Sequence, residues 1–194
     1  MKFSYILNGI GWADVHIECE GKTYYFGPSY LSEPLVDLVE GLLHVIPGCV
    51  PEDERRQVST FCWNYEPVGS EWRISLHDHS HLRIHVAEYD DIDAKTGGPK
   101  LVFDRVCDLR EIVSEVVKAL ESIILKHGFV GYRQTWYTRQ DFPISGYLRL
   151  KHYLQKGTKY PTEEAKEDGY IEYERSSLKD ELRALQSLLD GMDE

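Results

Sequence analysis

No apolar run in this chain reaches the ~18–20 residues that a membrane-spanning helix requires. The opening stretch MKFSYILNGIGW also lacks the basic, apolar and small-residue order of a secretory signal. The four cysteines, Cys19, Cys49, Cys62 and Cys107, show neither the CxxC spacing of a zinc site nor the pattern of a disulfide framework. From these absences we expect a cytoplasmic protein with reduced thiols.

Basic residues are scarce as well. The chain has 22 Lys and Arg against 33 Asp and Glu, a net charge of −11. Nucleic-acid-binding proteins gain affinity by neutralising phosphates with Lys and Arg, and anionic membranes attract basic segments in the same way. We therefore expect neither a nucleic acid nor a membrane as partner. An acidic surface would steer a basic protein toward this one, although many cytoplasmic proteins are acidic without such a role.

Sequence signatures of catalysis are missing. The chain contains no GxxxxGK[ST], GxSxG, HExxH or EF-hand loop. The Gly-x-Gly of NGIGWAD (8–14) is not a dinucleotide fingerprint, because Asp14 occupies the place of the third glycine and a strand follows. We therefore expect no cofactor. A Cys–His nucleophilic pair stays open as an alternative, since such partners need only be close in space.

Alternating apolar and polar residues predict strands. These strands cover residues 3–7, 14–21, 23–27, 59–67, 71–77, 81–89 and 100–106. Helical spacing predicts a helix from a Ser32 N-cap to Pro47, a long one from an Asp108 cap to Gly128, and a short one over 144–155. Because no βαβ alternation occurs, we expect an α+β fold with a mostly antiparallel sheet of about six to seven strands and helices packed on one face.

The composition changes after the predicted domain of residues 1–156. Residues 157–194 hold eleven Asp and Glu against five Lys and Arg, and TKYPTEEAKEDG is predicted to be a solvated linker. A C-terminal helical appendage follows, with Leu178, Leu182, Leu185 and Leu189 at alternating steps of four and three. Two heptads are too short for a free coiled coil. The helix should therefore dock on its own domain, which we favour, or on a partner such as a second copy of the chain.

Histidines are concentrated in the stretch SLHDHSHLRIH, which runs from the end of the fifth predicted strand into the sixth. The apolar residues of both strands must face the core, so Leu76 should pair with Leu82. His77 then faces His81 across the three-residue loop 78–80. The outer face of this hairpin should carry a basic stripe, which consists of Arg73, His77, His81, Arg83 and His85.

The basic stripe has three possible roles. Its members can be exposed polar residues without further function. They can receive carboxylates from a partner, with the histidine charge adjustable near neutral pH. Alternatively His77 and His81, with Cβ atoms ~5 Å apart, could share a divalent metal with His79 or Asp78 and form a metal-assisted hydrolase. His85 lies roughly 13 Å from His81 along the strand and cannot bind the same metal ion.

Aromatic residues concentrate in the stretches 23–30, 61–67 and 128–143. We expect GFVGYRQTWY to form a loop or an irregular edge strand. Its partner-binding candidates are Tyr132, Arg133, Trp136 and Arg139, because Tyr, Trp and Arg often anchor interfaces when they are partly exposed. The alternative is that the aromatic rings fill the core beside the long helix.

The segments YEP…EWRIS, KHGFVGYRQTW and DFP resemble those of small acidic bacterial proteins, some of which are toxin-neutralising immunity proteins. The resemblance spans residues 10–155 and rests on aromatic residues, Gly and Pro, none of them catalytic. It implies a protein that blocks a toxin, often a basic nuclease, without a cofactor, and it assigns no functional residues. Our first expectation is thus a non-enzymatic cytoplasmic binding protein. The alternatives are a hydrolase using His77, His79 and His81, and a subunit that self-associates through its C-terminal helix.

Overall fold

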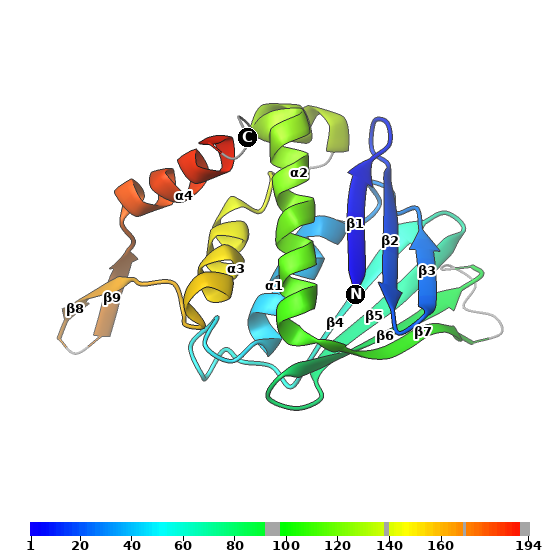
Figure 1. Cartoon of the computed structure of the whole chain (residues 1–194), viewed down its shortest axis with the longest axis horizontal. Coiled ribbons are helices and arrows are strands. Elements are labelled where there is room, and N and C mark those ends of the chain that lie inside the picture. The colour runs from blue at the N-terminus through cyan, green and yellow to red at the C-terminus, as the bar shows by residue number, and fades with distance from the viewer. Residues whose placement is uncertain (92–97, 138–139, 169, 191–194) are drawn as a thin grey trace.

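The structure is a computed structural model that describes residues 1–91, 98–137, 140–168 and 170–190 (Figure 1). Its architecture is α+β with antiparallel sheets, as expected. All seven predicted strands are present. They are β1 (Lys2–Leu7), β2 (Ala13–Cys19), β3 (Lys22–Phe26), β4 (Val58–Tyr65), β5 (Val68–Leu76), β6 (His81–Tyr89) and β7 (Lys100–Asp108).

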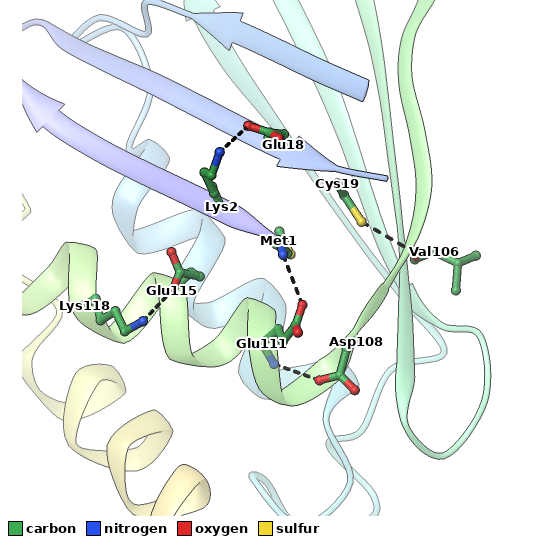
Figure 2. Close-up of polar contacts among 9 residues, drawn as sticks. All are labelled: Met1, Lys2, Glu18, Cys19, Val106, Asp108, Glu111, Glu115 and Lys118. Atoms are coloured by element: carbon green, nitrogen blue, oxygen red, sulfur yellow. Dashed lines mark hydrogen bonds and ion pairs between the residues drawn. The ribbon is translucent and has the colours of Figure 1, made fainter. Parts of the chain in front are cut away.

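These strands form two sheets and not the single sheet that we expected. One has the order β1-β2-β3 and the other the order β4-β5-β6-β7. The apolar faces of the two sheets meet through aromatic rings, with centroids 6.1 Å apart for Tyr24 and Trp72 and 6.5 Å apart for Phe26 and Trp63. The Cys19 thiol of β2 also donates to the Val106 carbonyl of β7 at 3.7 Å (Figure 2). Face-to-face packing buries one apolar face of each sheet, which a single open sheet would leave to the helices.

Three helices pack beside the sheets. They are α1 (Pro34–Val45), α2 (Leu109–Trp136) and α3 (Ile144–Lys156). Figure 1 shows α2 standing alongside β1, with α1 and α3 on the side away from β3. The predicted Ser32 N-cap of α1 is wrong: Glu33 occupies the cap position, and the Ser32 hydroxyl accepts a hydrogen bond from the Asn64 amide at 2.9 Å. Ser32 therefore ties the start of α1 to β4.

The start of α2 agrees with the prediction. The Asp108 carboxylate accepts a hydrogen bond from the Glu111 amide at 2.8 Å (Figure 2). The Glu111 carboxylate in turn lies 3.1 Å from the Met1 ammonium group at the start of β1. The cap thus satisfies a helix amide that lacks a partner within the helix, at the point where β7 runs directly into α2.

Replacing Asp108 with alanine should lower the free energy of unfolding by about 1 kcal/mol, because the first turn of α2 loses its cap. Asp108→Asn is the matched control, since the asparagine oxygen can accept the same bond. Urea unfolding of both variants measures the effect. Equal stability of Asp108→Ala and the wild type would show that the cap contributes nothing.

The helix α2 changes direction at Gly128, where φ is 66° and ψ is 175°. The predicted end of the first helical segment at Gly128 is therefore correct, but the loop or edge strand expected after it is wrong, because residues 129–136 are helical. Tyr132 and Trp136 are four residues apart on one helical face. That face points into the core, and both side chains are buried.

The C-terminal part also differs from the prediction. The predicted linker TKYPTEEAKEDG (158–169) includes the strand β8 (Glu163–Glu167). This strand pairs with β9 (Tyr170–Arg175) in a hairpin that leads to the predicted helix α4 (Leu178–Asp190) (Figure 1). Leu185 packs partly against the core, and the Lys151 ammonium group of α3 donates to the Ala184 carbonyl at 3.4 Å. Three leucines of the predicted seam are exposed, namely Leu178, Leu182 and Leu189. Self-association through α4 stays a prediction.

None of the helices within the described residues combines the length and the apolar character that crossing a membrane would need.

Candidate functional site

The histidine hairpin has the predicted register. Leu76 pairs with Leu82 and Arg73 with His85 across β5 and β6. The His77 amide donates to the His81 carbonyl at 2.9 Å, so these two residues close the hairpin as expected. The basic stripe therefore lies on the outer face of the four-stranded sheet.

Carboxylates from neighbouring positions neutralise much of this stripe. Arg83 donates two hydrogen bonds to Asp104 of β7, at 2.8 and 2.6 Å, and holds the pKa of that carboxyl below its usual range. His85 pairs with Asp104 across the ladder, with its ring nitrogen 3.9 Å from the carboxylate. Arg73 lies 2.6 Å from Glu71. The stripe is a network of alternating charges, which reduces its attraction for the carboxylates of a partner.

The loop of the hairpin is organised around Asp78. Its carboxylate accepts the Ser80 amide at 2.8 Å and lies 2.9 Å from the His81 ring, and these two contacts lower its pKa. His77 and His79 are exposed. Across the part of the chain that the structure describes, no three His, Cys, Asp or Glu residues are grouped to hold a metal ion. The metal-assisted hydrolase stays a hypothesis, and His77, His79 and His81 do not form a three-ligand group in this conformation.

The predicted aromatic contact residues do not share a surface. Tyr132 and Trp136 are both 0% exposed, so neither ring is available to a partner. Arg133 is half-exposed and donates to the Gln140 carbonyl at 3.2 Å. Arg139 lies outside the described residues. The helical continuation after Gly128 explains this difference, because it turns Tyr132 and Trp136 inward together.

A different set of apolar side chains gathers where the β1–β2 turn, the β3–α1 loop, the β4–β5 turn and the end of α2 meet. Their exposed fractions range from 39% to 71%, and none carries a charge. We call this set the aromatic surface, and it consists of Ile10, Trp12, Tyr30, Leu31, Tyr65 and Tyr137. The aromatic surface adjoins the start of β5, whereas the turn of the histidine hairpin follows the end of β5. The two candidate sites are therefore at opposite ends of that strand.

Backbone hydrogen bonds between distant segments hold the aromatic surface together. The Gly11 amide donates to the Thr135 carbonyl at 2.7 Å, and the Tyr30 amide donates to the Gly11 carbonyl at 2.9 Å. The Ser29 amide donates to the Asn64 carbonyl at 2.9 Å. These bonds tie three loops and the end of α2 into one framework.

Ring contacts and one glycine complete this framework. Trp12 meets Tyr65 edge to face with centroids 5.8 Å apart, and Tyr30 meets Tyr137 in the same way at 6.3 Å. Gly11 has a φ of 74°, and a Cβ atom there would lie 2.8 Å from the Tyr30 ring. Only glycine fits both the backbone conformation and the close approach of the ring. The exposed rings are thus fixed before any partner arrives.

The sequence holds a signal for this surface that the predictions did not use. Ile10 and Trp12 are large apolar residues in a glycine turn, where a buried position is unexpected. Tyr65 precedes the Glu66-Pro67 turn, and Tyr137 is the left-handed cap that ends α2. Apolar residues at the tips of several turns indicate an exposed patch, but only the fold shows that these tips converge.

Comparisons of this chain with protein-family models, with curated proteins and with solved structures find no match. A functional assignment must therefore come from the site itself.

Proposed function

We propose that this protein acts by binding another protein through the aromatic surface, without catalysing a reaction. The observation that carries the proposal is the convergence of six exposed, uncharged apolar side chains on one rigid framework. Contiguous exposed apolar patches often mark interaction sites in monomeric proteins. Tyr and Trp are enriched among the residues that dominate binding energy, because they present large areas and lose little conformational freedom.

The charge and the cysteines support a more specific form of this proposal. With a net charge of −11, the protein would attract a basic partner by long-range electrostatics. The buried thiols of Cys19, Cys49 and Cys107 form no disulfide, which suits a reducing compartment such as the cytoplasm. We propose a basic toxin as the partner, which the protein would neutralise in the manner of an immunity protein.

Truncating the aromatic surface should weaken partner binding by about tenfold or more, because each anchor in a protein interface contributes about 1–3 kcal/mol. Suitable variants are Ile10→Ala and Tyr137→Ala, since these side chains are 70% and 71% exposed and their removal should leave the fold intact. The partner is first captured from the source organism with the wild-type protein and then purified. Its affinity for each variant is measured by calorimetry.

The matched control is Tyr170→Ala on β9. This tyrosine is 80% exposed and lies far along the chain from the aromatic surface, so the affinity should not change. Circular dichroism of each variant checks that the fold is retained. Wild-type affinity in an Ile10→Ala, Tyr137→Ala double variant would rule out the aromatic surface as the binding site.

A further inference from the structure

An apolar groove lies between α3 and α4, and none of its lining residues belongs to the aromatic surface. Its volume is about 510 Å³, within the range of roughly 300–1,000 Å³ that is typical of binding pockets. Ile144 and Leu148 of α3 line it, as do Leu178, Leu182 and Leu185 of α4. The end of β9, the segment before β8 and the loop after α1 complete its walls. We call this cavity the α3–α4 groove.

Part of the apolar seam of α4 is left open to the groove. Leu185 packs partly against the core, and Lys151 of α3 donates to the Ala184 carbonyl at 3.4 Å, so α4 stays close to α3. Leu178 and Leu182 nevertheless line the groove with 65% and 56% of their surface exposed. A helix of 13 residues gains most of its stability from the packing of its apolar face. The exposed leucines therefore indicate a place for a further packing partner.

The spacing of the apolar lining residues fits another helix. Ile144 and Leu148 are one helical turn apart, and the leucines of α4 that line the groove follow steps of four and three residues. From Leu178 to Leu185 the groove follows ~10 Å of α4, which is about two helical turns. Rows of side chains on two neighbouring helices form a surface into which a third helix can pack residues at positions i, i+4 and i+7.

The two basic residues that line the groove are already engaged by the protein itself. Lys159 lies 3.9 Å from the Glu174 carboxylate, and the Arg149 guanidinium donates to the Cys49 carbonyl at 2.8 Å. The first charge is neutralised, and the second is held against the loop after α1. These residues are therefore poorly placed to attract an acidic ligand.

The acidic residues of the groove are less well balanced. Glu54 of the loop after α1 and Glu181 of α4 also line it, and neither pairs with a Lys, Arg or His in the part of the chain that the structure describes. Glu181 accepts a hydrogen bond from the uncharged Ser176 hydroxyl. Burial, together with the charges of Glu181 and Asp180, raises the pKa of Tyr160 beside them. The groove therefore favours a ligand that carries positive charge.

We propose that the α3–α4 groove binds a basic amphipathic helix of a partner protein. The apolar stripe of that helix would pack between α3 and α4, and Lys or Arg residues flanking the stripe would pair with Glu54 and Glu181. A second copy of α4 fits less well, because its own charged side chains are two basic and three acidic. The inference does not depend on the aromatic surface, which other residues form.

The test uses the full chain and a fluorescein-labelled helical peptide of leucine and lysine, in which the leucines recur at i, i+4 and i+7. Fluorescence anisotropy at physiological ionic strength should show saturable binding. A peptide of the same composition, with its leucines spread around the helix, should not bind, which separates the apolar stripe from a general attraction between opposite charges. A peptide with glutamate in place of lysine should not bind either.

Variants of the groove identify the place where the peptide binds. Leu178→Ala and Leu182→Ala should each weaken binding by about tenfold, because each removes apolar surface that the peptide would bury. The matched control is Leu189→Ala, since this leucine of α4 is 51% exposed but does not line the groove. Glu54→Gln should weaken binding by about threefold, as expected for an exposed ion pair. Glu52→Gln, in the same loop but outside the groove, should leave it unchanged.

Three outcomes would overturn the helix site. One is equal binding of the peptide with dispersed leucines. Another is wild-type affinity in a Leu178→Ala, Leu182→Ala double variant whose circular dichroism shows a retained fold. The third is a wild-type dimer in sedimentation velocity that Leu182→Lys converts to a monomer, because a second copy would then occupy the groove.

The proposed function is separable from these results. If Ile10→Ala and Tyr137→Ala lose the captured partner while the leucine–lysine peptide does not bind, the groove is wrong as a helix site and the aromatic surface stands. If the peptide binds with the expected pattern while those two variants keep full affinity for the captured partner, the groove stands and the aromatic surface is wrong.

Discussion

Replacing Gly146 with alanine should lower the free energy of unfolding by about 1–3 kcal/mol, although alanine normally stabilises a helix relative to glycine. Gly146 lies in the first turn of α3 and faces α1. An added Cβ would lie 2.3 Å from Cγ1 of Val39, which is fully buried. Because Val39 is β-branched, its side chain has few alternative rotamers. The overlap must be relieved by moving α1 and α3 apart.

Urea unfolding of four proteins isolates this contact: the wild type, Gly146→Ala, Val39→Ala and the double variant. Val39→Ala removes the atom that the new methyl group would strike, so the double variant should be more stable than the sum of the single effects predicts. Gly131→Ala in α2 is the matched control, because the nearest atom to its added Cβ would be 3.7 Å away. A Gly146→Ala protein at least as stable as the wild type would contradict the packing of α1 on α3.

Replacing Asp37 with asparagine should raise the free energy of unfolding by about 1–2 kcal/mol at pH 7.5. The pKa of Asp37 is about 6 in the folded chain and 3.8 without the protein environment, so folding favours the protonated form. The charged form therefore destabilises the fold above pH 6, and this penalty disappears as the pH falls toward 3.8. Part of the penalty is screened by solvent, which is why the expected gain is smaller than the full pKa shift implies.

The measurement is urea unfolding of the wild type and Asp37→Asn at pH 4.5 and 7.5. The stability difference should be clear at pH 7.5 and mostly lost at pH 4.5. Asp53→Asn, in the exposed loop after α1, is the control and should change little at either pH. A variant that is less stable than the wild type at pH 7.5 would show that the Asp37 charge supports the fold.

Local patterns predicted the elements of this fold well. Apolar alternation located the seven strands of the two main sheets, and the pairing of Leu76 with Leu82 followed from parity alone. The Asp108 cap and the turn at Gly128 were also correct. These features depend on residues that are neighbours in the chain, so the sequence specifies them directly.

Features that depend on distant segments were not predictable in the same way. The division into two sheets results from the packing of β3 rings on Trp63 and Trp72, which no local pattern encodes. The segment after Gly128 resembled a loop because its glycines and aromatic residues have low helix propensity. Burial of Tyr132 and Trp136 on one helical face outweighs that propensity.

The candidate site shows the same limit. The outer stripe was placed correctly, but the carboxylate that neutralises Arg83 comes from β7, 21 residues further along the chain. The aromatic surface combines side chains from four connections, and neither Ile10 nor Tyr137 indicates by itself that it meets the others. Convergence of this kind is a property of the fold.

Hydrogen exchange of the protein in its purified complex with the captured partner tests the central claim most directly. Partner binding through the aromatic surface predicts slower amide exchange in residues 9–12, 29–33, 64–66 and 135–137, with no change in the hairpin 77–81. Protection confined to that hairpin or to α4, with none at the aromatic surface, would contradict the proposed function.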